Sequence, residues 1–183
     1  MKLLHTYSNK RIDEQEETWE FLSKLNKNKW SIVHLYTIAY DYYKSLVYYI
    51  KHFQPFIVIE QDIVPSIQLL EEIANCSEQL CAAPYILYPQ STLLQNEVYS
   101  CRNVISQDPV TKEITSLKWV TPKDKTADYY PLGLTKFNLK DTSIISNSIT
   151  VPWNRCDHIL SQQTFSSGLK AHLHWREIKH NHK

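Results

Sequence analysis

The chain has 183 residues, of which 43% are apolar and 21% are charged, so it suits one globular core of ordinary composition. Its net charge of +1 lacks the broad basic field of a non-specific nucleic-acid binder, so we expect no nucleic-acid partner. No apolar run approaches the roughly 20 residues that cross a bilayer, and residues 1–4 are too short for a signal peptide. We therefore expect a cytosolic protein without a transmembrane segment.

Glycine and cysteine usage excludes several kinds of site. With only Gly133 and Gly168 present, the chain has neither a P-loop nor a GxGxxG phosphate-binding loop. The four cysteines, at 76, 81, 101 and 156, match no zinc or redox motif in their spacing. We expect them to be free and mostly buried thiols.

In its first half the chain alternates strand and helix patterns. We predict strands at residues 2–7, 30–36, 56–59 and 80–87, and helices at 14–26, 39–53 and about 66–74. The apolar run at 56–59 is typical of a strand buried on both faces. This order predicts the α/β class, with a mostly parallel central sheet and helices on both of its faces.

The second half is less regular. Strands are predicted at residues 97–104, 113–120, 132–137 and 170–174, separated in part by polar loops at 106–112 and 121–128. A helix is predicted at 157–165, and Gly168 follows its end.

Two carboxylates, Glu60 and Asp62, follow the most hydrophobic strand directly. Ligands of open α/β sheets bind at the carboxyl ends of strands, and residues two apart in an extended segment project to the same side. The pair therefore indicates an oxygen-rich site for a hard cation. The alternative is that Glu60 faces solvent and Asp62 caps the next helix.

Four segments together resemble a known family. Residues 56–65, FIVIEQDIVP, resemble the apolar strand and DxD segment of nucleotide-sugar glycosyltransferases with the GT-A fold, although Glu60 stands where Asp is common. Residues 131–137, PLGLTKF, resemble the family strand whose glycine lies near the donor sugar. Residues 153–157, WNRCD, resemble the segment whose acid begins a helix under the acceptor site. Residues 177–180, EIKH, resemble the C-terminal strand with a metal-binding histidine. Small GT-A proteins of archaeal viruses are the most similar.

The resemblance spans residues 1–183 and implies a single GT-A-like αβα domain, with a nucleotide-binding half at about 1–90 and an acceptor half at about 91–183. It implies an enzyme that moves a sugar from a nucleotide-sugar donor to a hydroxyl of an unknown acceptor, a glycan or a protein. A Mn²⁺ or Mg²⁺ ion held by Asp62 would neutralise the diphosphate leaving group. The cytosolic location would then be that of a host cell if the protein is viral.

Catalytic and metal-binding roles follow from the same resemblance. Asp157 would be the general base that takes the proton of the acceptor hydroxyl, or else simply an acid in the first turn of its helix. The late histidines form the pairs His172/His174 and His180/His182, each with both side chains on one face of an extended segment. We expect His180 to complete the metal shell and take His174 as the second choice.

Donor contacts are expected from residues at the ends of other elements. Thr6, Tyr7 and Ser8 follow the first strand, where the base and ribose would lie, although Tyr7 has packing as its alternative. Lys44 would meet a phosphate, or else be a solvated helix residue. Glu60 would contact the ribose or a metal-bound water, and Gly133 would lie close to the donor sugar. Thr135 or Lys136 would also touch that sugar, because strand alternation points only one of them into the cleft.

Two other readings use the same residues differently. A metal-dependent hydrolase or nuclease would bind zinc through the clustered histidines, although the chain has no HExxH motif. A catalytically inactive GT-A-like interaction protein would bind neither metal nor nucleotide. Binding of manganese or magnesium with a nucleotide sugar favours the transferase, whereas tightly bound zinc favours the hydrolase.

Overall fold

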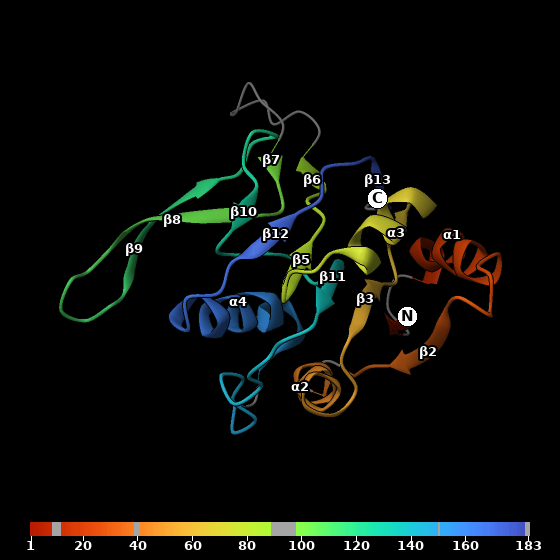
Figure 1. Cartoon of the computed structure of the whole chain (residues 1–183), viewed down its shortest axis with the longest axis horizontal. Coiled ribbons are helices and arrows are strands. Elements are labelled where there is room, and N and C mark those ends of the chain that lie inside the picture. Colours follow the sequence, from red (N-terminus) through yellow and green to blue (C-terminus); the bar gives the residue numbers. More distant parts are fainter. Residues whose placement is uncertain (9–11, 39–40, 89–97, 150, 182–183) are drawn as a thin grey trace.

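The computed structural model describes residues 1–8, 12–38, 41–88, 98–149 and 151–181 (Figure 1). The helices in these ranges are α1 (Ile12–Ser23), α2 (Tyr42–His52), α3 (Ile67–Asn75) and α4 (Cys156–Ser166), with a 3-10 turn η1 (Trp153–Arg155) before the last. None of these helices is long and apolar enough to span a membrane. The strands are β1 (Lys2–Tyr7), β2 (Ser31–Tyr36), β3 (Phe56–Glu60), β4 (Ile63–Pro65), β5 (Leu80–Ala82), β6 (Ile86–Tyr88), β7 (Val98–Tyr99), β8 (Arg102–Gln107), β9 (Ile114–Trp119), β10 (Thr126–Ala127), β11 (Leu134–Phe137), β12 (Ala171–Leu173) and β13 (Ile178–His180).

A seven-stranded sheet with the order β10-β12-β5-β11-β3-β1-β2 forms the centre of the structure. The β2, β1, β3, β5 and β12 strands run in one direction, whereas β11 and β10 are antiparallel to their neighbours. The protein is therefore a mixed α/β structure with a mostly parallel sheet, as the sequence predicts. Because β11 pairs with β3 on one side and β5 on the other, residues from the two halves of the chain share one sheet.

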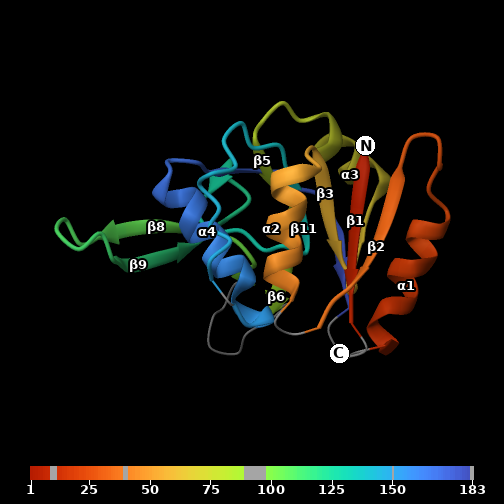
Figure 2. The same ribbon diagram turned by 90° about the horizontal axis from the view of Figure 1, so that it is seen from below.

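Both faces of the central strands are buried, and the alternation of side chains along β3 shows how. Phe56 and Val58 pack with apolar residues of α2 and α4 in one core cluster. Ile57 and Ile59 point the other way and pack with residues of α1 and α3 in a second cluster. Figures 1 and 2 show the two pairs of helices on opposite faces of the sheet. The continuous apolar run at 56–59 is explained by this double burial.

Most predicted elements are confirmed within a few residues at each end, and two predicted strands are split. The strand predicted at 97–104 corresponds to β7 and β8, separated by residues 100–101, and residue 97 lies outside the described ranges. The strand predicted at 80–87 is in fact β5 and β6, separated by residues 83–85. Pro84 has no backbone N–H to donate to a ladder, which accounts for the break. The predicted helix at 39–53 corresponds to α2, and residues 39–40 lie outside the described ranges.

Within the described residues, three two-stranded sheets lie outside the central one, and none of these pairings was predicted from the sequence. The β8 and β9 strands form a hairpin that projects from the body of the protein (Figure 1). The β6 strand pairs with β7, and β13 pairs with β4 immediately after the acidic turn. This last pairing brings the C-terminal segment to the carboxyl end of β3 and therefore positions the candidate site.

Candidate active site

Glu60 ends β3, and hydrogen bonds hold both its backbone and its side chain. Its backbone N–H donates to the carbonyl of Gly133 at 3.0 Å. The hydroxyl of Tyr42, at the start of α2, donates to Glu60 Oε1 at 2.8 Å. Thr6, which lies opposite Glu60 in the β1–β3 register, donates in turn to the Tyr42 hydroxyl oxygen at 3.4 Å. The carboxylate of Glu60 is thus part of a chain of hydrogen bonds from β1 through α2.

Asp62 lies two residues further on and faces His180. The β13–β4 register places His180 opposite Ile63, and the backbone N–H of Asn181 donates to the Asp62 carbonyl at 2.9 Å. As a result, His180 Nε2 is 3.4 Å from Asp62 Oδ2, and the two side chains are only 7% and 11% exposed. A carboxylate and an imidazole that are far apart in the sequence therefore meet at the carboxyl end of the central strand.

Gln61, between the two acids, ties the turn to the first strand and helix. Its side-chain oxygen accepts hydrogen bonds from the backbone N–H of Ser8 at 2.8 Å and from Gln15 Nε2 at 3.1 Å. Gln15 Nε2 also donates to the carbonyl of Ser8 at 2.6 Å. The buried amide of Gln61 therefore fixes the end of β1 against the acidic turn.

Tyr85 covers the Asp62–His180 pair, and a glycine makes room for it. The rings of Tyr85 and His180 have their centroids 4.5 Å apart. A Cβ atom at Gly133 would lie 2.8 Å from Tyr85 Cε1 and 3.0 Å from Ile63 Cγ1. Those distances are shorter than van der Waals contacts, so Gly133 is required for this packing rather than for an unusual backbone angle.

Asp157 reaches the same region from the first turn of α4. Its Oδ1 accepts a hydrogen bond from the backbone N–H of His158 at 2.7 Å, as expected of an acid near a helix N-terminus. Burial raises the pKa of Asp157, while the charge of Arg102 acts in the opposite direction. The guanidinium of Arg102 lies over the Trp119 and Tyr129 rings, 5.1 and 5.8 Å from their centroids.

The three carboxyl groups influence one another electrostatically. Burial, followed by the negative charges of Asp62 and Asp157, raises the pKa of Glu60 to about 8. Burial, and then the charges of the same three carboxylates, raises the pKa of Tyr85 well above its ordinary value. Clustered buried carboxylates are stable only when protons or a cation offset their repulsion. The site therefore has the electrostatic character of a cation-binding site.

Asp62 and His180 are the side chains of this site that could hold a divalent ion, and the carboxylate is the kind of ligand that Mn²⁺ and Mg²⁺ accept. Such ions prefer oxygen ligands, keep several waters and take one or two carboxylates plus substrate phosphates. Asp62 supplies an oxygen and His180 a nitrogen, both on the side of the site that Tyr85 covers. Oε1 of Glu60 is already bonded to the Tyr42 hydroxyl.

The structure brings together six of the residues predicted from the sequence, and Gln61 links Ser8 to them. These six are Thr6, Glu60, Asp62, Gly133, Asp157 and His180. Four further residues contribute to the site without having been predicted, and these are Tyr42, Gln61, Tyr85 and Arg102. Tyr42 stands in the apolar stripe of its helix, so the sequence predicts its burial but gives no signal of its bond to Glu60.

Other predicted residues lie elsewhere. The Tyr7 ring packs with those of His5, Trp19 and Tyr36, which is the packing alternative. Lys44 is on the exposed side of α2, so the expected phosphate contact has no support from its position. His174 lies beside two cysteines rather than with Asp62, as detailed below.

Neither Thr135 nor Lys136 faces a donor. The Thr135 hydroxyl donates to the Pro131 carbonyl at 2.5 Å within the core. The buried ammonium of Lys136 donates to the carbonyls of Ala74 and Cys76 at the end of α3. The expected sugar contact is therefore wrong for both. His182, the last of the late histidines, lies outside the described residues.

No model of a known protein family matches the chain, and a search of curated proteins finds no match either.

Proposed function

We propose that the protein is a metal-dependent glycosyltransferase that moves a sugar from a nucleotide-sugar donor to an acceptor hydroxyl. The observation that carries the proposal is the meeting of Asp62 and His180, 3.4 Å apart, at the carboxyl end of β3 with Asp157 close by. Ligand sites of open α/β sheets occur at this position, and the pair matches the metal-binding acid and C-terminal histidine of GT-A enzymes. The resemblance in sequence and the contact in space are independent supports.

Asp62 and His180 would hold a Mn²⁺ or Mg²⁺ ion, whose charge would make the nucleoside diphosphate a better leaving group. Glu60, held by Tyr42, would face the ribose or a metal-bound water. Thr6 lines the same strand ends next to Glu60, where the nucleoside would bind. Tyr85 would exclude water from the metal side of the site by covering His180.

Asp157 would act as the general base toward the acceptor hydroxyl. Burial raises the pKa of this carboxyl, which makes it a stronger base than an exposed aspartate. Its hydrogen bond from the His158 N–H fixes the orientation of the carboxylate. The hydrogen bond and charge of His158, and then the charge of Arg102, act against this rise in the pKa of Asp157.

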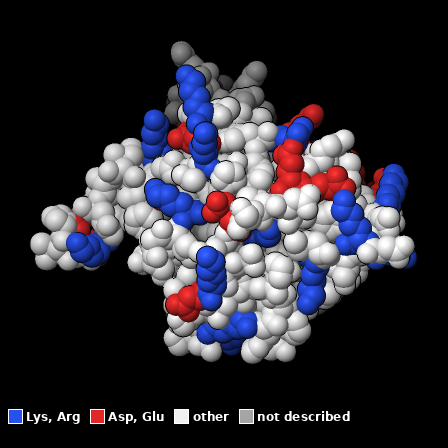
Figure 3. Space-filling view, in the orientation of Figure 1, with Lys and Arg blue, Asp and Glu red and all other residues white. Residues whose placement is uncertain are grey.

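Charge on the surface fits a small-molecule donor better than a polyanion. On the face shown in Figure 3, basic and acidic side chains are interspersed over the elements around the site. This agrees with the net charge of +1 and supports the expectation that nucleic acid is not the partner.

The proposal is tested by thermal unfolding with a panel of nucleotide sugars, with and without Mn²⁺. A ligand at one hundred times its Kd adds about 2.7 kcal/mol, which raises the Tm of a domain of this size by about 5 to 10 °C. We expect a Mn²⁺-dependent shift with one donor that is lost in Asp62→Asn and reduced in His180→Ala. Asp141→Asn, at an exposed loop position, is the matched control and should keep the full shift.

The alternatives give different results in the same experiment. Absence of a shift with every donor at millimolar concentration, with the wild type folded, would sink the transferase proposal and favour an inactive interaction protein. A shift that Asp141→Asn loses together with Asp62→Asn would show that the effect is not specific to the site.

A further inference from the structure

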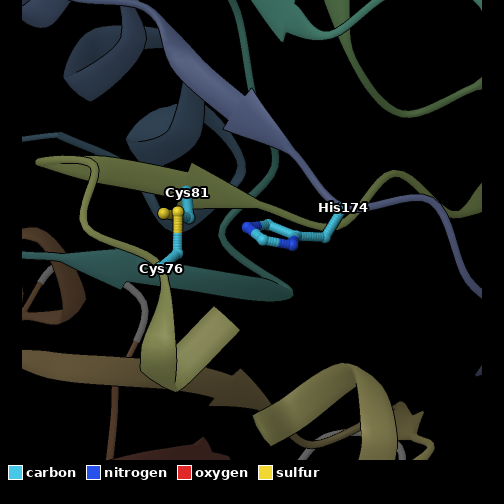
Figure 4. Close-up of side chains that lie close together, drawn as sticks. All are labelled: Cys76, Cys81 and His174. Atoms are coloured by element: carbon cyan, nitrogen blue, oxygen red, sulfur yellow. The ribbon is translucent and has the colours of Figure 1, made fainter. Parts of the chain in front are cut away.

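A second cluster of metal-ligating side chains lies outside the candidate active site. Cys76 caps the C-terminus of α3, Cys81 is in β5, and His174 follows β12. The ligand atoms of these three residues all lie within 4.8 Å of one another. Figure 4 shows the imidazole ring of His174 directed toward the two sulfur atoms.

The sheet topology explains how such distant residues meet. Because β12 runs parallel to β5 with His172 opposite Cys81, His174 extends just beyond the end of β5, and its N–H donates to the Ala82 carbonyl at 3.0 Å. Cys76 comes to the same face because the chain leaves α3 and enters β5 within a few residues. The spacing of these residues in the sequence matches no zinc motif, so only the folded chain brings them together.

An unpaired nitrogen in this cluster indicates a missing partner. His174 Nε2 is buried and makes no hydrogen bond within the described residues. A buried polar nitrogen without a partner carries a desolvation cost that no hydrogen bond offsets. A bound metal ion would remove that cost, because the lone pair of a neutral imidazole is a good metal ligand.

The donor atoms identify the class of ion. Two sulfurs and one imidazole nitrogen suit zinc, whereas Mn²⁺ and Mg²⁺ prefer oxygen. A tetrahedral zinc with bonds of about 2.3 Å to sulfur and about 2.0 Å to nitrogen places its ligand atoms roughly 3.3 to 3.8 Å apart. The atoms observed within 4.8 Å need to move by only about 1 Å to reach that geometry.

The surroundings balance the charge and leave one position open. Lys136, which is opposite Cys81 in the β11–β5 register, donates its ammonium N–H to the Cys76 carbonyl, so a positive charge lies beside the thiols. Burial raises the pKa of the Cys81 thiol, and the charge of Lys136 acts in the opposite direction. On the other side, a groove is lined by Cys76, His174, Glu72 and Arg176. The carboxylate of Glu72 is paired with Arg176 in this groove, so water rather than Glu72 would be the fourth ligand of a bound ion.

We propose that Cys76, Cys81 and His174 bind one zinc ion, with a water molecule from this groove as the fourth ligand. Each thiol transfers its proton to solvent as its sulfur binds zinc, so occupation of the site releases two protons. The ion links the end of α3 and β5 to the segment that leads into β13, and thus fastens the strand that carries His180. It is separate from the ion of the proposed transferase site and is tested without any nucleotide.

The test is titration of the reduced, metal-free full-length protein with Co²⁺ and Zn²⁺. We expect one equivalent of Co²⁺ to give thiolate-to-cobalt charge transfer and the visible bands of a tetrahedral site, with Zn²⁺ displacing it. Zinc should also raise the Tm. Cys76→Ser and His174→Gln, both at half-buried positions, should weaken cobalt binding at least tenfold while circular dichroism stays native.

Matched controls are available in the same chain. Cys156→Ser changes a buried thiol outside the cluster, and His172→Gln changes the neighbouring ring, 5.0 Å from that of His174. Both should bind cobalt like the wild type. A folded, reduced wild type that shows no thiolate-to-cobalt band overturns the proposal. Cobalt binding that is unchanged in both Cys76→Ser and His174→Gln overturns it as well.

Discussion

The buried pair of histidines in the first two strands predicts a specific loss of stability in acid. His5 is fully buried in β1, and its Nδ1 is 3.0 Å from Nδ1 of His34 in β2. The rings of Tyr7 and Trp19 pack against it at 5.6 and 4.7 Å. Its Nε2 has no hydrogen-bond partner within the described residues. Burial, and then the charge of His34, lowers the pKa of His5 to about 3.

The sign and size of the loss of stability follow from the linkage between proton binding and unfolding. Between pH 6.5 and about 3 the unfolded chain binds a proton at His5 that the folded chain does not, so the free energy of unfolding decreases as pH decreases. The contribution of His5 is complete above pH 6.5. Below pH 6.5 the contribution decreases by about 1.4 kcal/mol per pH unit. The free energy of unfolding should therefore fall by about 2 kcal/mol between pH 8 and pH 5, all of it below pH 6.5.

Urea unfolding of the wild type and of His5→Leu, at steps of half a pH unit from pH 8 to pH 5, measures the contribution of His5 to the free energy of unfolding. Leucine has a similar volume and no titratable nitrogen, so the wild type should lose about 2 kcal/mol more than the variant over this range. His52→Leu, which changes an exposed histidine at the end of α2, should follow the wild-type curve. Parallel curves for the wild type and His5→Leu would refute the reasoning, because burial would then not hold His5 neutral.

Three other substitutions test the packing and the site. Gly133→Ala should destabilise the fold by about 1 to 3 kcal/mol in urea unfolding, because the added Cβ would overlap Tyr85 and Ile63. Gly168→Ala has no atom close to the added Cβ, and it should cost about 1 to 2 kcal/mol only because the φ of 76° strains the backbone of a residue with a side chain. Lys136→Met should cost about 1 to 3 kcal/mol by leaving two carbonyls at the end of α3 unpaired, and the exposed Lys140→Met should cost nothing measurable. Asp157→Asn should keep the donor-induced Tm shift and lower the transfer rate by about 10²- to 10⁴-fold, and full activity in this variant would exclude Asp157 as the base.

Much of the architecture could be predicted from local patterns. The strand at 2–7 and the helix after Ser66 follow from hydrophobic periodicity and a capping residue, and Ser66 Oγ does accept the N–H of Leu69. The buried run at 56–59 correctly indicated a central strand with both faces covered. Such patterns are readable because burial imposes a period on nearby residues, independently of what lies across the core.

Some residues of the candidate site could be predicted from the sequence, and others could not. The acids Glu60 and Asp62 could be found because they follow the central strand directly. Tyr42 and Tyr85 could not, since a tyrosine in an apolar stripe has the same pattern whether its hydroxyl is used or not. Lys136 was misplaced because strand alternation gives the face of the sheet but not the helix end that its long side chain reaches.

The sequence by itself therefore determined the α/β class, the central strand and the acidic turn, all of which depend on contacts between residues close in the chain. Tertiary structure alone decided that β11 lies between β3 and β5, that β13 pairs with β4, and that His174 meets the two cysteines. These contacts join residues far apart in sequence, and no local period records which distant strand a segment will pair with. Both candidate metal sites depend on such pairings: one on β13 beside β4, the other on β12 beside β5.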